Sequence, residues 1–323
     1  MRKIIAPAAI LFAVVAAIYF TACSNKKSEP KATSSEDSVK KVVERGEYLT
    51  LHVTLCMDCH SKRDFSKFSG PIVPGTEGMG GEVIDQKLFD PMPGTVYAKN
   101  ITPDPETGIG TWTDDELLRA MTQGINKNGD TLFPIMPYAN YNRMAKEDLL
   151  SIIAYIRTLK PIKNAIPARH LMIPISMAYP GPALQKTIDA NVRPPESDQA
   201  KYGEYLTTMA DCGTCHTPFV KGQPDFSRAY AGGNTFQPGN FKVVSPNITP
   251  DSATGLGTWN EERFMNKFLP YREEKGYNYD PGKQNTFMPL TGYAGMTDND
   301  LKAMFTYLRT IRPVNNKVEK YPK

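Results

Sequence analysis

Two short runs of the sequence combine thiols and an imidazole at a fixed spacing. Residues 56–60 read CMDCH and residues 212–216 read CGTCH, which together use four of the five cysteines. Thiols three residues apart lie on one face of a helical turn. There they can form thioethers to the two vinyl groups of one haem, while the adjacent histidine binds the iron. A redox dithiol needs no such histidine, and a zinc site needs two further ligands nearby. We therefore predict two covalently attached haem c groups, bound by Cys56, Cys59, His60, Cys212, Cys215 and His216.

The sixth iron ligand is predicted from a repeated methionine. Met136 and Met288 follow their histidines by 76 and 72 residues, and each precedes a proline that fixes the loop. A haem iron bound by histidine and methionine is an electron-transfer arrangement. A rival pair, Met144 and Met296, directly precedes the last predicted helix, where methionine would more naturally act as a core filler. The predicted metal ligands are therefore His60, Met136, His216 and Met288, and packing or surface roles are predicted for His52 and His170.

The cysteine runs belong to a longer unit that is written twice. RGEYLT at 45–50 recurs as YGEYLT at 202–207, and EDLLSIIAYIRTLKPI at 147–162 recurs as NDLKAMFTYLRTIRPV at 299–314. The order of the repeated segments is preserved, which indicates a duplicated domain. The predicted organisation is a first domain at 39–162, a proline-rich linker at 163–199 and a second domain at 200–323. The apolar middle of the linker favours packing along the domains, and both hinge and clamp remain open.

A turn-rich stretch is also retained in both copies. It reads NITPDPETGIGTW at 100–112 and NITPDSATGLGTW at 247–259, and it contains both tryptophans of the chain. Such a stretch could cover the haem, where an indole N–H can donate to a propionate or the ring can pack on the macrocycle. The alternative is a core aromatic on a short helix. The further candidate cofactor-binding residues are Asn100, Trp112, Asn247 and Trp259.

Helices are expected to position these groups. Residues 45–55 have helical spacing and run into the first cysteine. Thr113 and Glu116 have the spacing of a capping box that opens a short helix, with Gly124 as its stop. Residues 146–159 form an amphipathic pattern, and Thr297 opens the equivalent helix in the second copy. No segment shows a convincing alternating strand pattern, so we predict an all-α fold of two tandem domains with long loops.

The first 38 residues have the layout of an export signal and a tether. Arg2 and Lys3 precede an apolar stretch at 4–20, and the whole resembles a bacterial lipoprotein signal, in which the cysteine becomes the acylated first residue. An uncleaved anchor is the alternative, but roughly 25 Å of helix is short of the ~30 Å hydrocarbon core. We predict a signal peptide at 1–22, lipid attachment at Cys23, a flexible tether at 23–38 and an exported protein that is anchored to a membrane and faces the periplasm.

Composition limits the classes of function. The chain has 323 residues, of which 40% are hydrophobic and 22% charged, so it can bury the cores of two ordinary domains. The formal charge is +4, which is too weak to indicate a nucleic-acid binder, because such proteins usually show clustered basic faces. We therefore predict no nucleic-acid partner.

Over residues 40–162 and 200–314 the chain resembles class I c-type cytochromes. Its GEYL, CxxCH, NITPD, MP and YLR runs are similar to those of two-haem, membrane-associated cytochromes, including the cytochrome subunits of periplasmic alcohol and gluconate-type dehydrogenases. The resemblance implies a free-standing electron carrier or a subunit of a larger complex. It also implies that the first and last helices of each domain cross, at Gly46 and Tyr48 with Tyr155, and at Gly203 and Tyr205 with Tyr307.

Three functions are compatible with two haems. Electron transfer between a redox donor and an acceptor needs six ligands on both irons. An enzyme such as a peroxidase, or a haem sensor, needs one labile iron, and the matching Met-Pro runs argue against it. We therefore predict an electron carrier with no catalytic residues. Two loops differ in length between the copies, 70–81 and the segment with Tyr271, Tyr277 and Tyr279, and these are predicted docking places for two different redox partners.

Overall fold

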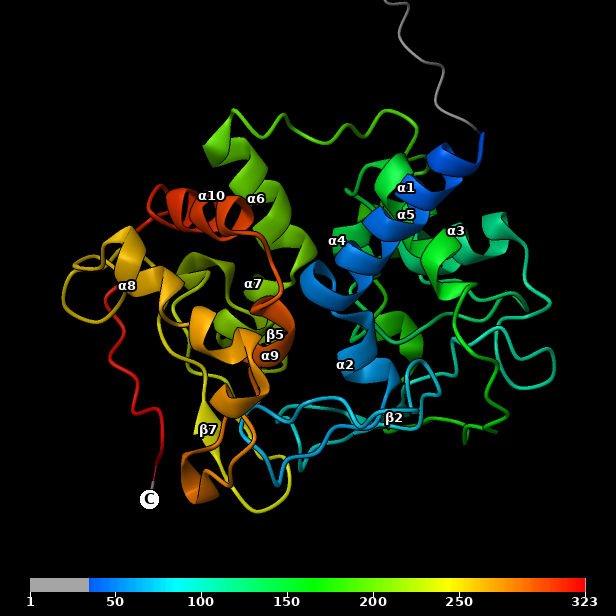
Figure 1. Cartoon of the computed structure of the whole chain (residues 1–323). Helices are drawn as coiled ribbons and strands as arrows, with labels where there is room; N and C mark the ends of the chain where they lie inside the picture. Colours follow the sequence, from blue (N-terminus) through cyan, green and yellow to red (C-terminus); the bar gives the residue numbers. More distant parts are fainter. Residues whose placement is uncertain (1–34, 323) are drawn as a thin grey trace, which may run out of the picture. The chain divides into compact units, whose positions relative to one another are not determined.

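The computed structural model describes residues 35–322 (Figure 1). Contacts divide the chain after Lys40, and residues 41–323 form one compact unit. The predicted signal peptide at 1–22, Cys23 and the predicted tether up to residue 34 lie outside the described residues. Among residues 35–322, no helix has the length and apolar character needed to cross a membrane.

The crossing of two helix pairs organises the fold, and glycines make it possible. A Cβ atom on Gly203 would lie 1.9 Å from the Ala303 carbonyl oxygen, and one on Gly46 would lie 1.8 Å from the Ser151 carbonyl oxygen. Only glycine permits two backbones to approach so closely. Tyr155 and Tyr307 adjoin the same two glycines, so the crossings implied by the resemblance are confirmed for Gly46 with Tyr155 and for Gly203 with Tyr307. The hydroxyls of Tyr48 and Tyr205 bond instead to Asp300 and Asp148 of the other half.

The first half of the molecule, residues 39–162, is mostly helical. Its capping box is confirmed, because Thr113 accepts from the Glu116 backbone N–H and Glu116 accepts from the Thr113 N–H; Gly124 ends that helix in the left-handed region. The elements are α1 (Ser35–Tyr48), η1 (Leu49–Val53), α2 (Cys56–His60), β1 (Val83–Ile84), β2 (Gly94–Tyr97), α3 (Asp114–Gln123), α4 (Tyr138–Tyr141) and α5 (Lys146–Ile156).

Helix α1 departs from the sequence-based expectation at both ends. It begins at Ser35, so residues 35–38 are helical and not part of a flexible tether; the acidic Glu36 and Asp37 in its first turn favour that start. Beyond Tyr48 the chain continues as a π-helix, η1. Seven residues separate Tyr48 from Cys56, whereas six separate Tyr205 from Cys212. The π-helix accommodates this one extra residue.

The linker packs along the first half, which favours a clamp over a hinge. Its strand β3 (His170–Leu171) pairs antiparallel with β2 and extends the sheet to the order β1-β2-β3. The Asn191 amide donates to the carbonyl oxygens of Asn142 and Met144, and Arg193 pairs with Asp148 at 2.9 Å. The two 3-10 turns η2 (Ile175–Met177) and η3 (Gly181–Ala183) lie between these contacts.

The second half, residues 200–323, repeats the helical order of the first. In Figure 1, α6 crosses α10 much as α1 crosses α5. Thr297 caps α10 by accepting from the Asp300 N–H. The elements are α6 (Gln199–Met209), α7 (Cys212–His216), β4 (Phe219–Val220), β5 (Gln223–Pro224), η4 (Phe226–Arg228), β6 (Thr235–Phe236), β7 (Val243–Val244), α8 (Glu261–Met265), η5 (Leu269–Arg272), η6 (Glu274–Gly276), η7 (Gly282–Gln284), α9 (Leu290–Tyr293) and α10 (Asp298–Leu308).

The prediction of a helical fold is confirmed, but the sequence patterns missed its strands. The strands are two to four residues long, and a run this short cannot show the alternation that marks a half-buried strand. They pair in antiparallel ladders within the long loops. The helices still supply most of the core that positions the cysteine runs.

Reciprocal hydrogen bonds join the two halves. The Tyr48 hydroxyl donates to Asp300 at 2.5 Å, and the Tyr205 hydroxyl donates to Asp148 at 2.8 Å. Both carboxylates are buried and sit at the start of the last helix of their half. A single apolar cluster contains buried residues of both halves. The two halves therefore share one core, and these hydrogen bonds form a polar seam between them.

Candidate haem-binding sites

Each cysteine run forms a single helical turn that is entered through a left-handed residue. Leu55 precedes α2 at φ 49° and ψ 43°, and Asp211 precedes α7 at φ 52° and ψ 33°. Left-handed backbone is unfavourable for residues with a Cβ atom, so its occurrence at both equivalent positions indicates a shared local design. The four thiols are free, and the helical turn places each pair on one face.

Both histidines of these runs are oriented for a metal. The Nδ1 atom of His60 lies 2.6 Å from the Lys99 carbonyl oxygen, and that of His216 lies 2.8 Å from the Pro246 carbonyl oxygen. A carbonyl can only accept, so Nδ1 carries the proton and Nε2 keeps its lone pair. Burial lowers the pKa of both imidazoles, although the carbonyl bonds oppose the shift. The neutral form needed by an iron ligand is therefore favoured.

The thiols lack the properties of a redox dithiol. Burial raises the pKa of Cys56 and Cys215, and it raises the pKa of Cys212 to about 12. Reactive cysteines have a lowered pKa, because the thiolate is the nucleophile. Within residues 35–322 no group of three or more His, Cys, Asp or Glu side chains is arranged to bind a metal ion. Neither alternative interpretation of the cysteine runs finds support in this geometry.

The methionine loops are anchored to the cysteine runs by tyrosines. The Tyr141 hydroxyl donates to the Thr54 carbonyl oxygen at 3.2 Å, and the Tyr293 hydroxyl donates to the Ala210 carbonyl oxygen at 2.6 Å. Each accepting residue stands two positions before the first cysteine of its own half. Neither tyrosine was predicted as a site residue from the sequence, although they end the matching MPYANY and MPLTGY runs.

The two methionine pairs lie in different surroundings. Met144 and Met296 are fully buried in the apolar core, which is the packing role expected of them. Met136 and Met288 are only partly buried and pack on its edge. The Tyr138 N–H donates to the Met136 carbonyl oxygen, and the Leu290 N–H donates to the Met288 carbonyl oxygen, both at 2.8 Å. Both Met-Pro turns therefore have the same local shape. This arrangement supports Met136 and Met288 as the iron ligands, which remains a prediction.

Hydrogen bonds within the protein explain the shape that the two NITPD loops share. The Asn100 amide donates to Thr107 and to the Ile162 carbonyl oxygen, and its oxygen accepts twice from Thr102. Asn247 makes the same set of bonds in the second half, at 2.7–2.9 Å. Each side chain is thereby saturated. A hydrogen bond from either amide to a cofactor would have to replace one of these, and their predicted cofactor contact stays a prediction.

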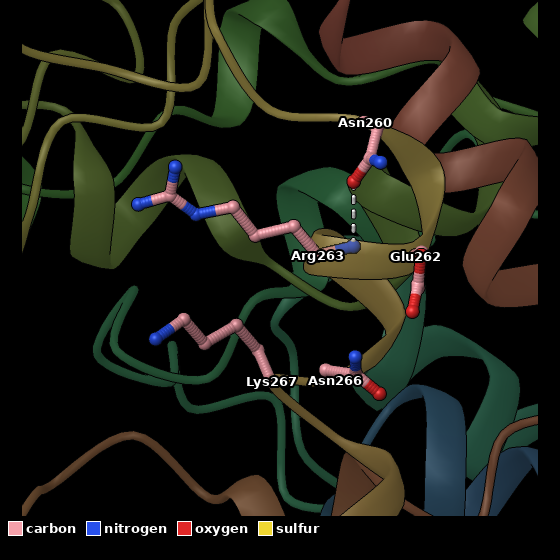
Figure 2. A pocket seen from close by; sticks show the side chains of 5 residues that line it. All are labelled: Asn260, Glu262, Arg263, Asn266 and Lys267. Atoms are coloured by element: carbon pink, nitrogen blue, oxygen red, sulfur yellow. Dashed lines mark hydrogen bonds between the residues drawn. The ribbon is translucent and has the colours of Figure 1, made fainter.

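The tryptophans lie half-buried against the core. Arg263 and Lys267 hold their charged groups over the Trp259 ring, at 4.6 and 5.3 Å from its centre. Such cation–π contacts stabilise both partners. Figure 2 shows the two cationic side chains extending side by side. They line a hollow of about 300 Å³ together with Asn260, Glu262 and Asn266. The predicted cofactor contacts of Trp112 and Trp259 are not tested by this arrangement.

Two carboxylates flank the cysteine runs. Asp211 accepts from the Asn140 amide at 2.7 Å and from the Thr214 hydroxyl at 2.6 Å, and burial raises its pKa to about 7. Asp58 lies 3.5 Å from Arg63, and burial raises its pKa to about 6 against the opposing effect of that guanidinium. Asn140 belongs to the first half and Asp211 to the second, so this contact crosses the seam.

The second half matches a known family. Residues 200–312 match the family model described as cytochrome c. This stretch is thus similar to a cytochrome c domain. Such a domain carries covalently attached haem c, and the residues present fit that group: paired protonated thiols, a histidine with a free Nε2 atom and a partly buried methionine. The resemblance to c-type cytochromes predicted from the sequence is confirmed.

Relatives extend the similarity of the cytochrome c domain to most of the chain. The chain is 28% identical to "Alcohol dehydrogenase (quinone), cytochrome c subunit" of Gluconobacter oxydans, over 88% of this chain and 57% of that subunit. It is 28% identical to "Gluconate 2-dehydrogenase cytochrome c subunit" of Pantoea cypripedii, over 87% of this chain and 62% of that subunit. It is 26% identical to "Diheme cytochrome c-type" of Cereibacter sphaeroides, over 79% and 81%.

The chain therefore spans little more than half of the two dehydrogenase subunits it resembles. Its homologues are cytochrome c subunits, which agrees with a role in electron transfer.

Of the weaker histidine candidates, His52 has a packing role: its ring lies against Gly295, and its Nδ1 atom lies 2.9 Å from the Gly292 carbonyl oxygen. His170 lies in the exposed part of β3. Neither histidine adjoins a cysteine run in sequence.

Proposed function

We propose that the protein is a dihaem c-type cytochrome that transfers electrons between redox partners outside the cytoplasm. The observation that carries this proposal is the duplicated histidine geometry, in which a backbone carbonyl fixes the same tautomer at His60 and His216. The matching thiol pairs and Met-Pro turns support one haem in each half. The two halves are accordingly two tandem cytochrome c domains, at 39–162 and 200–323, joined by the linker at 163–199.

Each haem iron would supply a one-electron ferric–ferrous couple. The chain's own residues set the conditions for that couple. His60 and His216 present neutral Nε2 atoms, and Met136 and Met288 present thioether sulfurs, which raise the potential. The carbonyl oxygens of Lys99 and Pro246 fix the imidazole rings. Full ligation excludes water and substrate from the iron, so the protein itself is proposed to have no catalytic residues.

The partners and location are proposed from the relatives and the N-terminus. Cytochrome subunits of dehydrogenases are among the relatives, and we infer that a dehydrogenase or respiratory complex supplies or accepts the electrons. Acylation at Cys23 after removal of residues 1–22 would hold the protein at a membrane that faces the periplasm. Labelled fatty acid tests this: the full chain should incorporate the label, and replacing Cys23 by serine should abolish the incorporation.

Carbon monoxide tests whether the irons are closed. In the full chain with its haems attached, the optical spectrum of the reduced protein should not change on addition of carbon monoxide, because a histidine and a methionine would hold each iron. Met136→Ala should open one iron, so that about half of the haem absorbance shifts. A shift of about half in the unaltered protein would instead favour a dihaem enzyme such as a peroxidase, and one methionine assignment would be wrong.

A further inference from the structure

The loop that follows the first cysteine run holds the Met288 segment of the second half. Asn285, three residues before Met288, is 1% exposed. Its amide donates to the carbonyl oxygens of Phe65 and Lys67, at 3.0 Å each, and its oxygen accepts from the Ser69 N–H at 2.8 Å. One buried side chain of the second half thus binds three backbone groups of the first half, which fixes the two segments against each other.

The Ser69 side chain forms hydrogen bonds to both ends of the Met-Pro turn. Its hydroxyl donates to the Met288 carbonyl oxygen and accepts from the Leu290 N–H, both at 2.8 Å. The side chain is fully buried, so water cannot replace either bond. One hydroxyl therefore joins the backbone on both sides of Pro289 to the first half.

The backbone of Ser69 is itself in an unfavourable conformation. Its φ angle is 65°, in the left-handed region, and Gly70 follows at 55°. A residue with a Cβ atom adopts this region only where the surroundings determine it. Here the conformation turns the hydroxyl toward Met288, whereas glycine would adopt the same backbone more easily but would lack the hydroxyl.

A buried arginine holds the loop in this shape. Arg63 donates to the carbonyl oxygens of Gly70 at 2.9 Å, Ser69 at 2.6 Å and Phe287 at 3.3 Å. Its guanidinium also lies over the rings of Phe65 and Phe287, at 4.7 and 5.3 Å. Phe287 directly precedes Met288, so Arg63 connects the loop to the methionine segment from a second side.

The first methionine loop has a different environment. The Met136 N–H donates to the Phe133 carbonyl oxygen, and its carbonyl oxygen accepts from the Tyr138 N–H. Among the described residues, no hydrogen bond from the second half reaches residues 133–137. Hydrogen bonds from the other half to the Met-Pro turn thus occur at the second site and not at the first, although the two turns share the same local bonds.

We propose that Ser69 is a positioning residue for the second haem site, through which the first half holds the iron ligand Met288 in place. This inference rests on the proposed function, because it takes Met288 as the sixth ligand of the second iron. It assigns the first half a role beyond carrying its own haem: the second iron keeps its methionine only when the loop at 63–70 is in place.

The test is Ser69→Gly in the full chain with both haems attached. Glycine removes the hydroxyl but accepts the left-handed backbone without strain, so the fold should survive. Imidazole is titrated into the ferric protein, and its binding to each iron is followed optically, together with the weak long-wavelength band that reports sulfur coordination to ferric haem. One iron should bind imidazole about tenfold more tightly than in the unaltered protein, because two hydrogen bonds that hold its methionine are lost.

Ser66→Gly is the matched control. Its hydroxyl donates to Asp64 within the same loop and, among the described residues, bonds to no group of the second half, so imidazole binding should stay unchanged. Equal effects of the two variants would overturn the proposal in favour of general loosening of the loop, and so would an unchanged affinity in Ser69→Gly. In a Met136→Ala background, which opens the first iron, Ser69→Gly should tighten imidazole binding at the second iron; an effect at the first iron would also overturn it.

These outcomes are separable from failure of the proposed function. A single haem per chain, or an iron already open in the unaltered protein, counts against the dihaem carrier. An unaltered protein with two closed irons and an insensitive Ser69→Gly variant counts only against the role of Ser69. A thermal unfolding curve of Ser69→Gly that matches the unaltered protein would show that the change in ligand binding does not arise from unfolding.

Discussion

Replacing Gly203 by alanine should destabilise the protein by about 3 kcal/mol or more. The added Cβ atom would lie 1.9 Å from the Ala303 carbonyl oxygen and 2.4 Å from the Ala303 carbonyl carbon. Both are backbone atoms of α10, so no side chain can rotate to relieve the clash. The helices α6 and α10 would have to separate along their whole crossing. Chemical unfolding of the full chain, followed by circular dichroism, measures the loss.

Gly213→Ala is the control for that substitution. It also places alanine on a helix of the second half, but the nearest atoms to its Cβ, those of the Tyr230 ring, lie at 3.8 Å. Alanine favours helix over glycine by up to about 1 kcal/mol, so this variant should be neutral or slightly stabilising. Equal stability of the two variants would show that the crossing can widen at little cost, and the close approach would then not be a constraint.

Much of the site was predictable because its chemistry is local in sequence. The thiols and histidine of each run lie within five residues, so their relative positions follow from one helical turn. The crossing glycines were implied by the resemblance to c-type cytochromes, whose GEYL run occurs in both copies. The capping box at Thr113 needed only residues three positions apart. In each case a short segment determines its own geometry.

Other features depend on segments far apart in the chain, which no local pattern indicates. The tyrosines of the longer loop in the second half were predicted to dock a redox partner. In the structure, Tyr271 and Tyr279 stack on Phe68, with ring centres 5.0 and 5.6 Å away. The Phe68 N–H also donates to the carbonyl oxygens of Tyr277 and Tyr279. This loop therefore contacts the first half, and a docking role would have to use its remaining exposed surface.

The π-helix illustrates the same limit within a single element. Helical spacing at 45–55 predicted one regular helix, but the structure changes to π-helical geometry at Leu49. The reason lies in the tertiary structure. Tyr48 has to meet Asp300, and Cys56 has to start its own turn, so the extra residue between them is absorbed without moving either end. Comparison of the two copies, with seven and six intervening residues, contains this information, whereas one copy alone does not.

Replacing Asp148 by alanine should lower the free energy of unfolding by about 3–5 kcal/mol. Its carboxylate, 1% exposed, accepts two bonds from Arg45 at 3.0 Å, one from Arg193 at 2.9 Å and one from the Tyr205 hydroxyl at 2.8 Å. Burial and the neighbouring carboxylate raise the pKa of Tyr205 well above its usual value, so this hydroxyl stays protonated and donates. Removal of the carboxylate leaves two guanidinium groups and a buried hydroxyl without their hydrogen-bond acceptor.

The ion pair of Asp189 with Lys146 provides the control. It joins the linker to the same helix α5 at 2.6 Å, but both side chains are largely exposed. Such pairs contribute at most about 1 kcal/mol, so Asp189→Ala should have a small effect that added salt reduces further. Urea unfolding of both variants in the full chain measures the difference. Equal losses would mean that Asp148 contributes no more than a surface charge.

Asp148 accepts hydrogen bonds from the first half, the linker and the second half, so its replacement should weaken the contact between the two halves. The double variant Asp148→Ala with Tyr205→Phe tests this through a thermodynamic cycle. If the hydroxyl–carboxylate bond holds the halves together, the two substitutions should be non-additive by about 1 kcal/mol or more, because the second removes a group that the first has already left unpaired. Strict additivity would mean that the bond seen at 2.8 Å contributes nothing to the seam. The seam would then depend on its apolar core alone.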